Sequence, residues 1–74
     1  RSVSRGLGDV YKRQVVALTS TGVLDSSLQY HIMNAKKNGV SENELTESLT
    51  HIAMYVGWPK IWAALKYIKE VYSK

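Results

Sequence analysis

Shortness constrains this chain more than any motif in it. Its 74 residues suffice for one domain, and a domain of this size buries only about 60% of the surface that its unfolded chain exposes. The sequence contains no cysteine, so neither disulfides nor zinc–thiolate sites supply the missing stability. A hydrophobic fraction of 45% is nevertheless too high for a disordered protein. We therefore expect one small globular domain that gains stability by forming a homo-oligomer.

The net charge of +4 first suggests a nucleic-acid partner, but the charges are unevenly distributed. Residues 1–14 carry four basic side chains against one acidic side chain, for a net charge of +3. Residues 15–74 carry six lysines against five acidic residues, for a net charge of +1, and these lysines are spread over predicted outer helix faces. No apolar run approaches the roughly 18 residues of a membrane span. We therefore expect neither a nucleic-acid partner nor a membrane association. We expect a cytoplasmic location.

The first 14 residues differ in composition and apolar pattern from the rest of the chain. They hold two closely spaced glycines and little apolar periodicity, which is typical of a loose leader. The string VSRGLGDVYKRQ also resembles a peptide that precedes many unrelated translated metagenomic fragments, and we interpret it as read-through of sequencing-adapter DNA. The alternative is a native basic arm. We predict a non-native or disordered leader at 1–14 and a helical domain at 15–74 that is truncated at its N-terminus.

Helix start and stop signals divide the predicted domain into short segments. Asp25 is a good N-cap, and Ser41 with Glu44 has the spacing of a capping box. Gly39 favours the left-handed conformation that follows many helices, Gly57 ends the next segment, and Pro59 fits the first turn of the last one. The run 15–18 suits either a strand or a helix, and we favour a helix that ends before Gly22. The signals predict further helices over about 25–38, 41–56 and 58–72.

Apolar residues recur every three or four positions within these segments, as on the buried face of a helix. Short connections favour antiparallel neighbours, so the fold class is all-α, a small antiparallel helical bundle. The predicted inward stripes are Leu24, Leu28, Ile32 and Ala35; Leu45, Leu49, Ile52 and Val56; and Ile61, Leu65, Ile68 and Tyr72.

Three titratable residues stand apart from these stripes. His31 lies at the edge of its stripe, while Glu47 and His51 are four residues apart on the next segment, with Tyr55 four residues further on. A carboxylate at this spacing can hydrogen-bond to the imidazole along one helix face and fix its tautomer. Such a pair suits proton transfer near neutral pH.

Plainer interpretations remain open for the same residues. His31 fits a hydrogen-bonded histidine at the edge of the core, and the polar line of Glu47, His51 and Tyr55 fits a solvated face or a subunit interface. Two histidines and a glutamate on separate helices could also ligate a metal, but a shared geometry is not evident in the sequence. We expect no metal and no cofactor.

The spacing of these residues also matches a family pattern. The stretch His31-x-x-Asn34-Ala35-x-x-Asn38-Gly39-Val40-Ser41-x-x-Glu44, followed by Glu47, His51 and Tyr55-x-Gly57-x-Pro59, resembles the carboxymuconolactone decarboxylase family. The resemblance covers residues 15–74. It implies the all-helical alkylhydroperoxidase D-like fold and a homo-oligomer, commonly a trimer or hexamer, whose interfaces complete the pockets.

The resemblance further implies a cofactor-free decarboxylation of a lactone carboxylic acid from aromatic catabolism. His31 would be the lead acid or base, Glu47 and His51 its partners from the next helix or a neighbouring subunit, and Tyr55 and Trp58 the pocket lining. The alternative is a non-enzymatic helical oligomer that binds a small acid or a protein partner.

A dithiol peroxidase is the third function that the superfamily suggests. Its members carry C-x-x-C-x-x-x-H, and the positions of the two thiols here are Leu24 and Ser27, before His31. Since the chain holds no cysteine, that reaction is excluded for it unless a partner supplies an external thiol.

Overall fold

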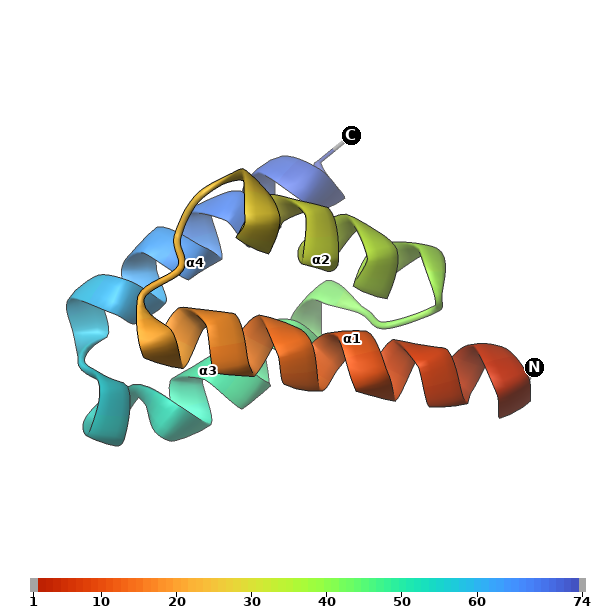
Figure 1. Ribbon diagram of the computed structural model, residues 1–74, viewed down its shortest axis with the longest axis horizontal. Coiled ribbons are helices and arrows are strands. Elements are labelled where there is room, and N and C mark those ends of the chain that lie inside the picture. The colour runs from red at the N-terminus through yellow and green to blue at the C-terminus, as the bar shows by residue number, and fades with distance from the viewer. Residues whose placement is uncertain (1, 74) are drawn as a thin grey trace.

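The protein folds into four helices, as the computed structural model shows over residues 2–73, the part of the chain that it describes (Figure 1). The helices are α1 (Ser2–Thr21), α2 (Ser26–Lys37), α3 (Glu42–Val56) and α4 (Trp58–Tyr72). No strand occurs within this range. The all-α prediction is therefore confirmed.

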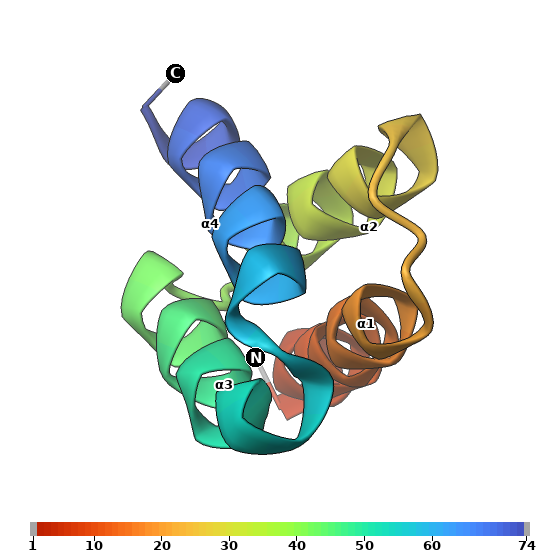
Figure 2. The same ribbon diagram turned by 90° about the vertical axis from the view of Figure 1, so that its left-hand side faces the viewer.

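The four helices are arranged around a common centre, as the end-on view of Figure 2 shows, and one hydrophobic core lies among them. α1 packs most extensively on α2, α3 packs on α4, and α2 also contacts α4. Each helix contributes one buried apolar stripe. The fully buried large side chains of the core are Val15, Leu28, Ile32, Leu45, Leu49, Ile61 and Ile68.

The predicted helix ends are confirmed in atomic detail. The Asp25 carboxylate accepts a hydrogen bond from the Ser27 N–H at 2.9 Å, which caps α2. Ser41 and Glu44 form the reciprocal capping box of α3. Gly39 and Gly57 have φ angles of +90° and +103°, which side chains disfavour, so these two turns depend on glycine.

The predicted stripes are correct in direction but rotated slightly from the true buried faces. Leu24, Ile52, Val56, Leu65 and Tyr72 are only partly buried, whereas Ala53, Ala64 and Val71 are buried in full or nearly so. The prediction favoured large side chains. The observed core instead includes two alanines and a valine of α3 and α4, while several larger apolar neighbours lie at its margin.

The segment 2–14 forms the first part of α1 and is helical where the sequence predicted a loose leader. Its Gly8 is buried against the loop after α2, and Tyr11 packs at the margin of the core. Its origin as adapter read-through stays a prediction. In the fold, this segment extends the contact between α1 and α2.

The C-terminal end of α4 is fastened to α2 and the loop after it. The Tyr72 hydroxyl donates a 2.6 Å hydrogen bond to the Val40 carbonyl, and the Lys36 ammonium donates one to the Val71 carbonyl at 3.1 Å. Burial, with smaller contributions from Glu44 and Glu42, raises the pKa of Tyr72 to about 12.

Two alanine substitutions test whether segment 2–14 packs in solution. A Cβ at Gly8 would lie 2.9 Å from both the Asn38 carbonyl oxygen and Val40 Cγ2, whereas a Cβ at Gly6 would meet nothing within 4 Å. Gly6→Ala should therefore stabilise the protein by about 0.5–1 kcal/mol through helix propensity. Gly8→Ala should destabilise it by about 1 kcal/mol, because overpacking outweighs that gain. Chemical denaturation measures both, and two variants with equal effects would contradict the packing.

The partly buried Tyr72 phenol, whose pKa is raised chiefly by burial, should make stability depend on pH in the alkaline range. An unfolded tyrosine loses its proton near pH 10, while the native phenol keeps it to about pH 12. Between these values the native state binds the extra proton, so the free energy of unfolding falls as the pH rises. Denaturation of the wild type and Tyr72→Phe from pH 9 to 12 should show their stability gap narrowing. A constant gap would contradict this assignment.

Candidate functional site

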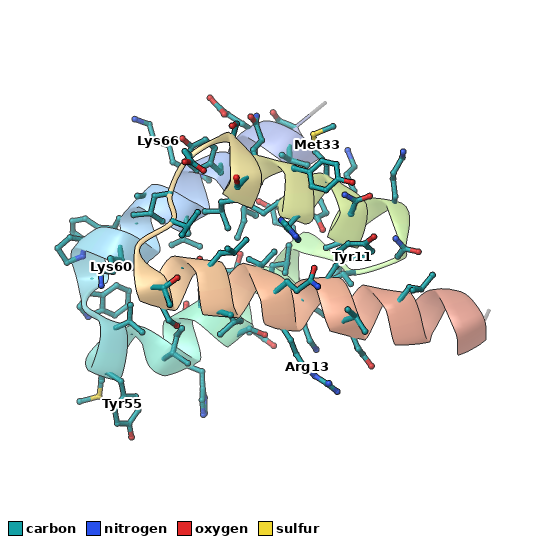
Figure 3. The ribbon with its side chains drawn as sticks, viewed as in Figure 1. Tyr11, Arg13, Met33, Tyr55, Lys60 and Lys66 are labelled. Atoms are coloured by element: carbon teal, nitrogen blue, oxygen red, sulfur yellow. The ribbon has the colours of Figure 1, made fainter. Side chains whose placement is uncertain are left out.

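His31 lies halfway along α2 at the junction with α1, and it is partly buried. Its ring meets Tyr30 edge-on at a centroid distance of 5.4 Å, and it lies 6.3 Å from the ring of Tyr11 on α1. Figure 3 shows Tyr11 between α1 and α2. The imidazole is thus flanked by two aromatic rings that restrict its orientation and partly exclude water.

One hydrogen bond determines which of the two ring nitrogens of His31 carries the proton in the neutral imidazole. The Nδ1 atom lies 2.9 Å from the Ser27 carbonyl oxygen, one turn earlier in α2. Because a carbonyl only accepts, Nδ1 must carry a proton and donate it. In the neutral ring, Nε2 is then the basic nitrogen, available to exchange a proton with a bound molecule.

The polar line on α3 exists as the sequence predicts, but its members do not engage one another. Glu47, His51 and Tyr55 are all exposed. Over residues 6–73, whose side chains are described, no hydrogen bond or ion pair joins Glu47 to His51. The proposed fixing of the His51 tautomer by Glu47 is therefore absent from this conformation.

A shallow, open groove of about 410 Å³ runs beside Glu47 and His51, between α3 and α1. Its other lining residues are Val16, Ser48 and Ile52. The groove thus offers one carboxylate and one imidazole above an apolar floor. It has room for a small organic molecule but leaves much of one exposed to water.

His31 and the pair on α3 lie on different sides of α1. Tyr11 faces His31, whereas Val16 lines the groove of His51. These two α1 residues are five positions apart, which separates them by about 140° around the helix. No described contact joins His31 to Glu47 or His51. A joint site of the three residues would therefore need groups from more than one chain.

The two predicted pocket-lining residues lie at the turn between α3 and α4. Tyr55 points away from the other helices (Figure 3), and Trp58 lies against Trp62 with a ring separation of 6.4 Å. None of the ring contacts among the described residues joins Tyr55 or Trp58 to His31. Within one chain, these aromatic residues line no site with His31.

The aromatic neighbours of His31 were not predicted from the sequence. Tyr30 directly precedes it, and an edge-on contact with the ring of the next residue carries no periodic signal. Tyr11 fell within the segment taken as a leader, although its spacing of four from the buried Val15 was a usable signal.

Neither a metal site nor a membrane span is found in the part of the chain that the structure describes. Over residues 2–73, no three His, Asp or Glu side chains are grouped so that they could share a metal ion. None of the helices in that range combines the length and apolar character that crossing a membrane requires.

Comparison with known proteins identifies the family. No curated protein and no solved structure gives a significant match. The sequence model of the carboxymuconolactone decarboxylase family matches residues 13–70, well over half of the 74-residue chain. The matched region includes the end of α1, all of α2 and α3, and most of α4, together with His31 and the polar line of α3. The chain therefore belongs to the carboxymuconolactone decarboxylase family.

Proposed function

We propose that this protein decarboxylates a lactone carboxylic acid without a cofactor, and that His31 carries the proton transfer. Membership of the family supports the reaction class. The observation that carries the proposal is the state of His31, whose Nδ1 donates to the Ser27 carbonyl and leaves Nε2 to the surroundings. A histidine fixed in this way is suited to acid–base chemistry.

The reaction requires one bond to break and one proton to move. The bond between the carboxylate carbon and the ring breaks, carbon dioxide leaves, and the electron pair passes into the conjugated lactone. A proton must then reach the carbon that receives the pair. His31, protonated on Nε2, donates it and returns to the neutral tautomer that its bond to Ser27 favours.

The aromatic rings beside His31 favour decarboxylation because they reduce the hydration of a bound carboxylate. Tyr11 and Tyr30 give the imidazole apolar flanks, and a partly dehydrated carboxylate is less stabilised than one in water. Roles for Glu47, His51, Tyr55 and Trp58 in the same reaction stay predictions, and they require a neighbouring copy of the chain because one chain keeps these residues away from His31.

The alternative function is a helical oligomer that binds a small acid or a protein without chemistry. One observation favours it: Glu47, His51 and Tyr55 are exposed and unengaged by one another. Such side chains suit a contact surface as well as a catalytic role.

Substitution of His31 tests the reaction. His31→Gln preserves an amide donor near Ser27 but cannot transfer a proton, so the rate of carbon dioxide release from a carboxylated lactone should fall by about 100-fold or more. Lys37→Gln, an exposed change on the same helix, should leave the rate unchanged. Circular dichroism should show equal helix content in both variants.

Two results would count against the proposal. Full activity in His31→Gln would exclude His31 as the acid. No release of carbon dioxide by the wild type from any of a panel of carboxylated lactones would favour the binding function. In that case, NMR titration with the same acids would show whether they still shift the resonances of His31.

A further inference from the structure

The loop after α2 begins with Asn38 followed by Gly39, the one asparagine–glycine pair in the chain. In such a pair the side-chain amide carbon and the next backbone nitrogen can join in a five-membered ring. Glycine hinders their approach least because it has no Cβ. Gly39 is exposed, has a φ angle of +90°, and a Cβ added to it would meet nothing within 4 Å. The pair is therefore accessible to water and has no side chain packed over its glycine.

Two hydrogen bonds engage the groups that would react. The Asn38 Nδ2 donates to the Asn34 carbonyl at 2.8 Å, and the Gly39 N–H donates to the Lys36 carbonyl at 3.2 Å. Both bonds lie at the C-terminal end of α2, and the last turn of a helix opens more readily than its interior. The reaction therefore requires only that this turn frays, and the rest of the domain can stay folded.

We propose that Asn38 is a site of spontaneous deamidation through a cyclic imide. The Gly39 nitrogen attacks the Asn38 Cγ and loses its proton, a bond forms between them, and the bond from Cγ to Nδ2 breaks. The departing amide nitrogen takes up that proton and leaves as ammonia. Water then opens the ring without any oxidation or reduction. Opening at Cγ gives aspartate, whereas opening at the main-chain carbonyl gives isoaspartate, in which the backbone continues through Cβ and Cγ.

Either product places a carboxylate where the Asn38 amide now donates. Asn38 is the C-cap of α2, and the partial negative charge at a helix C-terminus disfavours an anion there. A carboxylate cannot donate to the Asn34 carbonyl, so two acceptor oxygens would replace the present hydrogen bond. The nearby Lys36 ammonium already donates to the Val71 carbonyl on α4. Deamidation should therefore destabilise the end of α2.

The same loop joins α2 to both α1 and α4 (Figure 1). The Asn38 carbonyl and the Val40 side chain lie against Gly8 of α1, and the Val40 carbonyl accepts the hydrogen bond of Tyr72 on α4. Isoaspartate inserts an additional carbon atom into the backbone before Gly39, which shifts Val40 relative to α2. The modified loop should therefore separate from Gly8 and from Tyr72. This proposal is independent of the proposed decarboxylation.

Peptide mapping by mass spectrometry measures the reaction at each asparagine of the folded chain after storage in mildly alkaline buffer. Asn38 should convert at least about tenfold faster than Asn34 and Asn43, because the residues after those two carry a Cβ. In concentrated urea Asn38 should convert faster still, since its hydrogen bonds at the end of α2 are then lost.

The isoaspartate form, separated by its added negative charge, tests the effect on the fold. Its folding equilibrium constant should fall by about tenfold or more, and Tyr72→Phe should lower it no further because the bond to Val40 is already lost. Asn38→Asp adds the charge without changing the backbone, so it should weaken folding but keep the effect of Tyr72→Phe. Asn43→Asp adds the same charge in the first turn of α3, where the helix dipole favours it, and should not weaken folding.

Two results would each overturn the proposal. One is a folded chain in which Asn38 keeps its amide for as long as Asn34 and Asn43 do. The other is an isoaspartate form that folds as stably as the wild type and is still weakened by Tyr72→Phe. Because neither measurement uses turnover, a failure of the proposed decarboxylation would leave both results unchanged.

Discussion

Burial of one apolar stripe from each of four helices is the constraint on which the rest of this structure depends. None of the shorter helices is stable alone, because a helix of 12 or 15 residues is marginal in water without tertiary packing. Leu28 and Ile32 of α2 therefore define where α2 lies on α1 and α4. The position of His31 is a consequence of this packing. As the residue beside Ile32, it is held at the edge of the core, where the Ser27 carbonyl and two tyrosine rings reach it.

The helix caps and turns of this fold were predictable from the sequence because each depends on residues that are neighbours in the chain. The Asp25 cap, the capping box at Ser41 and the glycine turns at Gly39 and Gly57 are properties of four or five consecutive residues. The exact buried face was less predictable. Ala53 and Ala64 are in the core, and which face of a helix is buried depends on its contacts with other helices, some of them far away in sequence.

In the candidate site too, local features were predictable from the sequence and tertiary contacts were not. The position of His31 at the core edge was predictable from the helical spacing, and so was the exposed line of Glu47, His51 and Tyr55 on the next helix. Whether these groups meet depends on how α1 passes between α2 and α3, which periodicity within one helix does not encode. The ring of Tyr11 reaches His31 for the same tertiary reason. Family membership, in contrast, was predictable from the residues between His31 and Pro59, and the family match over residues 13–70 confirms it.

At the edge of the core, His31 is held with its Nδ1 donating to the Ser27 carbonyl, which leaves Nε2 for acid–base chemistry. A long-range ¹H–¹⁵N correlation spectrum of the two histidine rings tests this most directly, with the exposed His51 as a reference in the same sample. We expect neutral His31 to carry its proton on Nδ1. A proton on Nε2 would contradict the hydrogen bond to Ser27 and, with it, the assignment of His31 as the acid.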